Sequence, residues 1–295
     1  MNKRNSTDGA RALLSLILSV SIFGTIGLAR KYIPLPSGSI AFFRGLIGTV
    51  TLLLVMLILR KKPSREAIRK NLWILLVSGA FIGFNWILLF EAYNYTSVAT
   101  ATLCYYMAPM LVVLVSPFLL GEKMTLRRAI CVLVTLAGAV CVSGVLRGGE
   151  VSWRGILLGL GAALLYASII LLNKRLREID AYDRTVVQLA SAAAVLLVYT
   201  LLAEEVSLNA FTPSVIWLLV LVGVVHTGIA YALYFGSVGA LRAQTVAIFS
   251  YIDPAVAVLL SALVLREEMG IVEIVGAVLI LGSAVVSEME VRKKD

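Results

Sequence analysis

The sequence predicts an all-α membrane protein in which ten transmembrane helices form two inverted five-helix repeats. Three observations support this fold class. The 295-residue chain is 60% hydrophobic and only 15% charged, whereas soluble domains carry about 25% charged residues. Apolar runs of roughly twenty residues, long enough to cross a bilayer, recur from one end of the chain to the other. The second half of the chain also matches the first half when it is shifted by 145 positions.

Ten apolar runs, separated by mostly short connections, are expected to be the transmembrane helices. The first follows Lys3, Arg4 and Arg11 and resembles a signal peptide. It is roughly 18 residues long and has no convincing cleavage site, so we expect an uncleaved first span. The boundary between the eighth and ninth runs is the least marked, because residues 210–241 carry no formal charge. The runs cover 12–30, 38–59, 71–93, 97–120, 127–146, 154–173, 184–203, 213–236, 243–265 and 270–288.

The Lys and Arg residues fall mostly on one side of this arrangement. If the N-terminus is cytoplasmic, ten spans return the C-terminus to the cytoplasm, and most of the 26 Lys and Arg residues lie in cytoplasmic connections. Arg44 lies within the membrane. The residues outside are Arg30, Lys31, Arg147, Arg154 and Arg266. The positive-inside rule then predicts a cell membrane (inner or plasma membrane) protein with both termini in the cytoplasm. It also accounts for the net charge of +9 without a nucleic acid partner.

Residues 1–148 and 149–295 are expected to be one five-helix unit used twice. An odd number of spans in each half means that the two halves enter the membrane from opposite sides. Inverted repeats are typical of secondary transporters, whose binding site lies near the midplane where the halves meet. At the offset of 145 positions, the coinciding residues include Gly83 with Gly228, Tyr106 with Tyr251, Pro109 with Pro254, and Glu122 with Glu267.

Pro109 and Pro254 interrupt apolar runs at equivalent places in the two halves. Each frees the carbonyl four residues back, which other protein groups or a watery cavity must satisfy. We therefore expect two kinked helices that line a solute pathway. Asp253 lies roughly 15 Å into its run, near mid-bilayer, where an acid should face protein or water. It is a candidate proton carrier or a ligand for a cationic part of a solute. The alternative is a structural acid that hydrogen-bonds the gap left by Pro254.

His226, Arg44 and Glu91 are the other candidates for coupling or gating. His226 is the single histidine and lies near mid-depth in the eighth run. It is either a proton-coupling partner of Asp253 or a hydrogen-bonded packing residue. Arg44 and Glu91 lie at similar depths, so we expect an ion pair with a structural or gating role. Direct contact with solute, or extension of Arg44 to the outer headgroups, are the alternatives.

Aromatic and amide side chains supply the rest of the candidate site. Tyr106 and Tyr251 lie deep in the two proline-containing runs, and a buried tyrosine needs a hydrogen-bond partner that a cavity can supply. Asn85 lies one turn from the position equivalent to His226, on the same helix face. We expect no metal and no cofactor, because the sequence has no Gly-x-x-x-x-Gly-Lys-Ser/Thr motif for nucleotides, no His-Glu-x-x-His motif and no paired cysteines. The candidate solute-binding residues are Asn85, Trp86, Tyr106, Tyr166, His226, Tyr231, Tyr251 and Asp253.

Two five-span halves, each with a proline in its fourth span followed by Glu122 or Glu267, resemble the drug/metabolite transporter superfamily. The chain is most similar to its ten-helix EamA-type family. The resemblance extends to Phe23-Gly24, Tyr166-Ala167 and Ala41-Phe42-Phe43-Arg44, with Gln188 at the place equivalent to the last of these. It implies transport of small solutes by alternating access through a cavity lined by the first four helices of each half. It also implies that the fifth helices support packing or dimerisation.

The sequence therefore predicts a secondary transporter of a small metabolite, such as an amino acid or a related amphipathic solute. Export follows from the resemblance alone, and proton coupling is left open. The expected partners are a small-molecule solute and the lipid bilayer, and the chain is expected to be a monomer or a homodimer without enzymatic activity. Two alternatives are an intramembrane lipid-modifying enzyme, which would need clustered acids, histidines or metal ligands, and a passive facilitator of the same fold.

Overall fold

The computed structural model describes residues 3–121, 124–147 and 151–289, which are helical with short connections and contain no β-strand. The predicted boundary between residues 148 and 149 lies outside these residues, as does Glu122. The elements are α1 (Lys3–Gly24), α2 (Ile26–Lys31), α3 (Ser37–Ile58), α4 (Arg65–Tyr95), α5 (Val98–Tyr105), α6 (Ala108–Leu120), α7 (Leu126–Val142), η1 (Val145–Arg147), α8 (Trp153–Asn173), α9 (Ala181–Ala203), η2 (Leu208–Ala210), α10 (Pro213–Gly223), η3 (Val224–Ile229), α11 (Ala230–Val238), α12 (Ala243–Ser250), α13 (Ile252–Leu263) and α14 (Ile271–Glu288).

Eight helical segments of the described residues are long and apolar enough to cross a membrane. Helices α7, with 17 residues, and α14, with 18, are shorter. Large apolar side chains cover the outside of the molecule, including Leu57 (72% exposed), Trp73 (77%) and Phe118 (86%). So much exposed apolar surface is unusual in a soluble protein but suits contact with lipid. The chain is therefore an all-helical, integral multi-pass membrane protein. The eight segments are Gly9–Lys31, Ser37–Ile58, Arg65–Tyr95, Val98–Leu119, Trp153–Asn173, Ala181–Ala203, Pro213–Val238 and Thr245–Leu263.

Four of the eight segments are interrupted within their length. Helices α1 and α2 meet at Thr25, α5 and α6 around Tyr106, and α12 and α13 at Tyr251. In the segment Pro213–Val238, the π-helical turn η3 separates α10 from α11. Pro109 and Pro254 follow two of these interruptions, where the missing proline N–H cannot continue the ladder of backbone hydrogen bonds. Such interruptions are tolerated at membrane depth where the backbone is buried in protein or lines a cavity.

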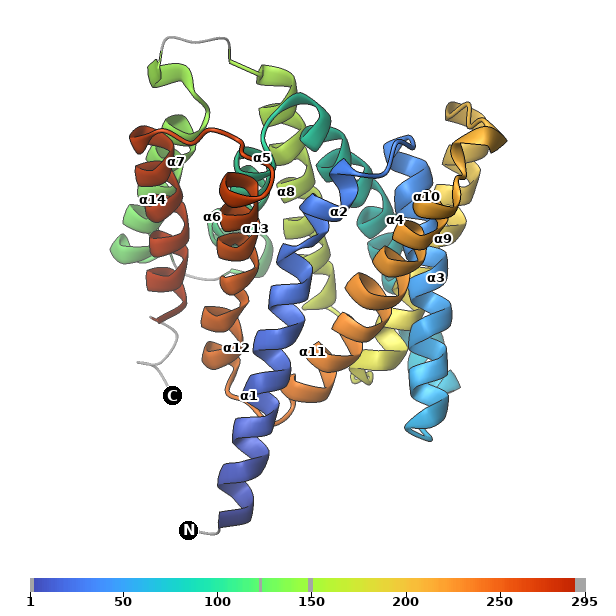
Figure 1. The fold of residues 1–295 in the computed structure, drawn as a ribbon. Helices are drawn as coiled ribbons and strands as arrows, with labels where there is room; N and C mark the ends of the chain where they lie inside the picture. The colour runs from blue at the N-terminus through green and yellow to red at the C-terminus, as the bar shows by residue number, and fades with distance from the viewer. Residues whose placement is uncertain (1–2, 122–123, 148–150, 290–295) are drawn as a thin grey trace.

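The helices of the first half, α1 to α7, pack mainly against those of the second half, α8 to α14 (Figure 1). Helix α4 lies along α8 and α9, α3 along α9, and α1 along α11 and α13. Small residues allow the closest approaches. A Cβ on Gly79 of α4 would lie 2.4 Å from the carbonyl oxygen of Gln188 on α9. The two halves therefore share one interface rather than forming separate units.

Helices α7 and α14 lie side by side at one edge of the molecule (Figure 1). Their backbones approach closely at two glycines, since a Cβ on Gly138 would lie 2.9 Å from the carbonyl oxygen of Gly276. A hydrogen bond of 2.7 Å joins the hydroxyls of Thr135 and Ser283 across the same interface. The two helices thus form a pair beside the other elements.

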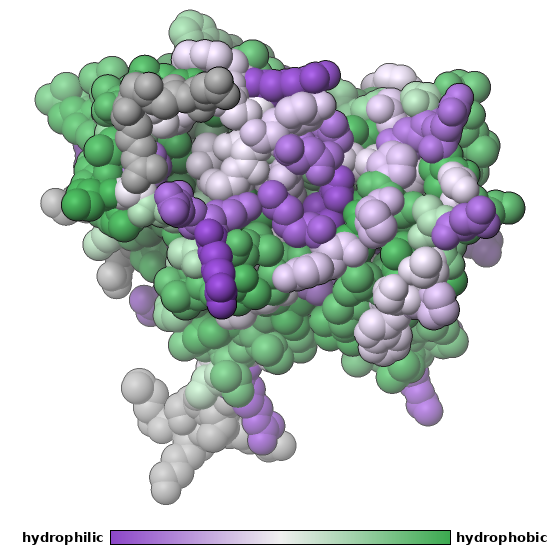
Figure 2. All heavy atoms as spheres, turned by 45° about the horizontal axis from the view of Figure 1, so that its top comes forward, coloured by the Kyte–Doolittle hydropathy of each residue, from purple (hydrophilic) through white to green (hydrophobic). Residues whose placement is uncertain are grey.

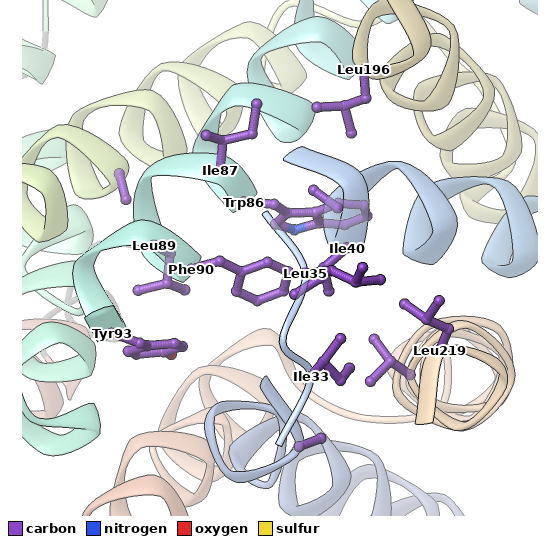
Figure 3. Packing of buried hydrophobic residues seen from close by; sticks show 14 of the residues in the cluster. Ile33, Leu35, Ile40, Trp86, Ile87, Leu89, Phe90, Tyr93, Leu196 and Leu219 are labelled. Carbon is purple, nitrogen blue, oxygen red and sulfur yellow. The ribbon is translucent and has the colours of Figure 1, made fainter. Parts of the chain in front are cut away.

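Apolar residues close the end of the molecule at the top of Figure 1, which we call the upper end. Ile33 and Leu35, in the connection between α2 and α3, belong to one buried cluster with Trp86, Phe90 and Leu219 (Figure 3). These side chains come from the α2–α3 connection, α4 and α10. The cluster therefore ties elements of both halves together above the middle of the molecule.

Two carboxylates of the second half bind helix N-termini of the first half at the upper end. Glu204 accepts hydrogen bonds of 2.8 Å from the backbone N–H groups of Gly38 and Ser39, at the start of α3. Glu267 accepts one of 2.7 Å from the N–H of Val98, at the start of α5. Negative charge is favourable at a helix N-terminus. Hydrophilic residues gather in the middle of this face (Figure 2).

Candidate functional site

A cavity of about 310 Å³ lies between the two halves. Its walls come from α1 to α5 of the first half and from α8, α9 and α11 to α13 of the second. Helices α7 and α14 contribute none of the lining residues found. Among the predicted site residues, the lining set contains Arg44, Asn85, Trp86, Tyr106, Tyr166, Tyr231 and Asp253.

Asp253 lies in the first turn of α13, directly after the interruption at Tyr251. Its carboxylate accepts a hydrogen bond of 2.5 Å from the hydroxyl of Tyr106, at the equivalent interruption in the first half. Helix α1 approaches closely at the same level, because a Cβ on Gly24 would lie 2.5 Å from the backbone oxygen of Asp253. The acid is therefore held where three helices of both halves meet at the cavity wall.

Arg44 projects from α3 into the cavity wall with 6% of its surface exposed. Its guanidinium lies 4.0 Å from the ring centre of Trp86, in cation–π geometry. Its Nε donates a 3.1 Å hydrogen bond to Thr227 Oγ1 in the π-helical turn η3. Arg44 and Asp253 thus place a base and an acid in one cavity.

Aromatic rings form much of the remaining wall. The rings of Tyr105 and Tyr166 stack at 5.2 Å between centres. Tyr231 of α11 lies 5.2 Å from Phe23 and stacks on Phe235 at 5.7 Å. Such surfaces bind the apolar part of a ligand while the tyrosine hydroxyls offer hydrogen bonds. The cavity is therefore amphipathic.

Asn85 lines the cavity, but its amide is used within the protein. Its Nδ2 donates a 2.6 Å hydrogen bond to the carbonyl of Ala162 on α8. Gln188 is similarly engaged, since its Nε2 lies 2.6 Å from Ser78 Oγ and 2.8 Å from Asn173 Oδ1. These amides join α4 to the second half, and both residues line the cavity.

Two of the candidate solute-binding residues, His226 and Tyr251, do not belong to the cavity lining, and neither do Glu91, Pro109 and Pro254. His226 lies in η3, where Nε2 is 2.8 Å from Thr25 Oγ1 at the α1–α2 interruption. It therefore links two interrupted segments behind the wall. Tyr251 packs against a cluster that contains Met110 and Cys131, and its ring centre lies 6.3 Å from that of Tyr106.

Arg44 and Glu91 do not form the expected ion pair, because each side chain contacts other residues. Glu91 lies toward the upper end, where its carboxylate accepts hydrogen bonds from Ser37 Oγ (2.7 Å) and Asn94 Nδ2 (3.1 Å). Arg30 donates to the same Ser37 and Asn94 side chains. Similar depth in the sequence did not reveal that the two side chains leave their helices toward different neighbours.

Sequence reasoning missed several lining residues. Arg184 resembles an ordinary cytoplasmic charge, and Tyr93 resembles an interfacial aromatic residue, because both lie near helix ends. An internal hydrogen bond between Tyr93 and Thr102, of 3.2 Å, forms part of the wall. Only the arrangement of helices shows that these ends face inward. The missed residues include Tyr93, Thr102, Asn173, Arg184 and Thr185.

The sequence matches the EamA-like transporter family twice, over residues 10–144 and 153–289. Similar proteins include the uncharacterized transporter YxxF of Bacillus subtilis, 29% identical over 87% of this chain and 82% of that protein. The uncharacterized transporter YoaV of the same organism is 27% identical, over 92% and 94% of the two chains. An uncharacterized transporter of Archaeoglobus fulgidus is 25% identical, over 94% and 96%.

One solved crystal structure shares the fold, with a TM-score of 0.67 and 21% identity over 97% of this chain and 99% of that chain. The two family matches fall on the two halves and account for the repeat seen in the sequence. The predicted family is therefore confirmed: the chain belongs to the EamA-like transporter family.

Proposed function

We propose that the protein is a secondary transporter that exports a small amphipathic metabolite, such as an amino acid or a related solute, by alternating access. The observation that carries this proposal is the cavity shared by both repeats, which holds Arg44, Asp253 and a tyrosine-rich wall. A charged residue is costly in the membrane and usually marks a substrate or ion pathway. Transporter sites of repeat proteins lie in this position, between the repeats.

The closed upper end supports alternating access. Tyr93 and Thr102, toward this end of the cavity, are 2% and 3% exposed, whereas Tyr166, deeper in the wall, is 36% exposed. We infer that the cavity opens away from the apolar cluster of Ile33 and Leu35. In a second state, the upper end would separate and the lower end would close, with the solute site kept between the halves.

The proposed topology has ten spans, with α7 and α14 also crossing the membrane and the two repeats inverted. The Lys and Arg asymmetry then places both termini in the cytoplasm of a cell membrane protein. The upper end faces outside, and the structure corresponds to a cytoplasm-facing state. Reporter fusions at the two termini and in the connection between α7 and α8 test this topology: both termini should report a cytoplasmic location, and the connection should report an outside location, since it would be cytoplasmic if α7 did not cross.

Asp253 is the proposed coupling residue, either as a proton carrier or as the partner of a cationic solute group. The Asp253→Asn variant keeps the shape of the side chain and its ability to accept from Tyr106, but it removes the charge. We expect it to abolish transport driven by a proton gradient while facilitated exchange without a gradient persists. Unchanged gradient dependence in liposomes would exclude Asp253 as the proton carrier.

Transport itself is tested by a thermal-shift screen of the purified protein against a metabolite library, followed by flux into liposomes. A solute that raises the melting temperature should also be carried, because ligand binding to the folded state stabilises it. Accumulation against a gradient distinguishes a secondary transporter from a passive facilitator, which only equilibrates the solute. The absence of flux for every stabilising solute would overturn the proposal.

A further inference from the structure

Arg44 is fixed in orientation before any ligand arrives. Its Nε bonds Thr227, whose hydroxyl in turn donates to the carbonyl of Val222 over 3.1 Å. Donation to Val222 orients the Thr227 oxygen to accept from the arginine. Helix α3 lies very close to this turn, since a Cβ on Gly48 would lie 2.4 Å from Thr227 Cγ2. The ring of Trp86 supports the guanidinium on one face. Preorganised groups of this kind are typical of binding sites.

In the part of the chain that the structure describes, no carboxylate lies within ion-pair distance of Arg44. Ion pairs there, such as Lys31–Glu267, Lys61–Asp180 and Lys70–Glu66, involve other residues. Asp253, the acid in the same cavity, instead accepts a hydrogen bond from Tyr106. A guanidinium has five N–H donors, and among the described residues Arg44 uses one, on Thr227. The remaining donors border the cavity.

We propose that Arg44 binds the carboxylate of the transported solute, and that the solute is a monocarboxylate with an apolar body. This inference rests on the transporter function proposed above and adds the chemical class of its solute. A guanidinium and a carboxylate pair through two parallel hydrogen bonds, which supply both affinity and orientation. The pair also neutralises a buried charge that would otherwise be costly.

The rest of the cavity favours one negative charge over two. Asp253 lies in the same wall and disfavours a dianion such as a phosphate ester, because like charges at low dielectric repel strongly. The stacked rings of Tyr105 with Tyr166, and of Tyr231 with Phe235, offer an apolar surface beside Arg44. A monocarboxylate with an apolar body would bind Arg44 through its carboxylate and these rings through its apolar part.

Trp86 provides a direct reporter of this site. The other three tryptophans, Trp73, Trp153 and Trp217, are 77%, 58% and 66% exposed and lie outside the cavity lining. Replacing these three with Phe leaves Trp86 as the single emitter, in contact with Arg44. The probes are phenylacetate, 3-phenylpropanoate, 4-methylpentanoate and L-phenylalanine, each compared with its own amide. Emission of Trp86 in detergent-purified protein gives the affinity for each probe.

We expect at least one carboxylate to change the Trp86 emission saturably, with an affinity roughly tenfold or more above that of its amide. Arg44→Gln should remove this preference. Arg44→Lys, which keeps the charge without the two parallel donors, should retain part of it. Arg154→Gln is the matched control, because Arg154 also lies over an aromatic ring, Tyr95, but away from the cavity. It should leave the titration unchanged.

Equal binding of acid and amide, binding of the acid unaltered in Arg44→Gln and Arg44→Lys, or no response to any of the carboxylates would overturn the carboxylate site. Its failure can be told from failure of the transporter function. Liposome flux of a neutral or cationic solute, with no carboxylate titration of Trp86, would refute the site and leave the transporter. A normal titration without flux of any bound solute would leave the site and refute the transporter.

Discussion

Single side chains determine the chemistry of the cavity, and each is held by one or two defined neighbours. Tyr106 fixes the Asp253 carboxylate by donating its hydroxyl hydrogen. Thr227 and Trp86 fix Arg44. The bonds of Tyr106 with Asp253 and of Arg44 with Thr227 couple the two halves at the level of the site, whereas Trp86 supports Arg44 from within the first half.

The hydrogen bond between Tyr106 and Asp253 leads to a prediction. Tyr106→Phe should lower the melting temperature, since a hydrogen bond to a charged group contributes about 1.5–3 kcal/mol. It should also slow solute flux, because the carboxylate loses its fixed position. Tyr166→Phe is the matched control: Tyr166 lines the same cavity, but its hydroxyl makes no hydrogen bond within the described residues. Equal effects of the two variants on stability and flux would contradict the assigned role of the bond.

The sequence indicated how deep each polar residue lies in the membrane, but not toward which neighbouring helix its side chain points. Asp253 and Tyr106 could be predicted as deep polar groups because they lie beside prolines in long apolar runs. Their mutual contact was not predicted. The partner of Arg44 was missed for a further physical reason: the π-helical turn η3 rotates Thr227 toward α3, and a regular 3.6-residue period does not foresee that rotation.

At the scale of elements, interrupted helices and glycine contacts shape the cavity. The all-helical architecture followed from hydropathy and length, because a lipid-embedded backbone must satisfy its own hydrogen bonds. The interruption of α1 at Thr25 and the π turn η3 had no proline to mark them. His226 joins these two places through Thr25. The sequence showed a histidine at mid-depth but could not show that it bonds another helix behind the cavity wall.

The contact between α1 and α13 gives a prediction with a control on the same helix. Gly24→Ala should lower the melting temperature, because its Cβ would lie 2.5 Å from the Asp253 backbone oxygen. Forced overpacking of this kind costs about 1–3 kcal/mol. Flux should fall as α13 and its carboxylate are displaced. Gly9→Ala, where nothing lies within 4 Å of the added Cβ, should leave both quantities nearly unchanged. A tolerated Gly24→Ala would show that α1 and α13 can separate without loss of the site.

At the scale of the whole molecule, the two halves are joined at the upper end and surround a cavity below it. Glu267 is central to this connection, because it caps α5 through Val98 and pairs with Lys31 at 3.1 Å. Both contacts cross between the halves. Alternating access requires that such contacts break and re-form, so their strength sets the balance between the two states.

Weakening this connection should therefore shift the balance toward the state that is open at the upper end. Glu267→Gln loses the ion pair and weakens the cap on α5, a change of about 1–3 kcal/mol, which corresponds to a roughly fivefold or larger rise in the open population.

A cysteine placed at Thr102, on the buried upper wall of the cavity, reports this state. With Cys104, Cys131 and Cys141 replaced by Ala, a membrane-impermeant thiol reagent added outside should label it several-fold faster. Glu66→Gln, which removes the exposed Lys70–Glu66 pair at the start of α4, should leave the labelling rate unchanged. Identical rates in the two variants would mean that Glu267 does not hold the upper end closed, and the closure would then rest on the apolar cluster around Ile33 and Leu35.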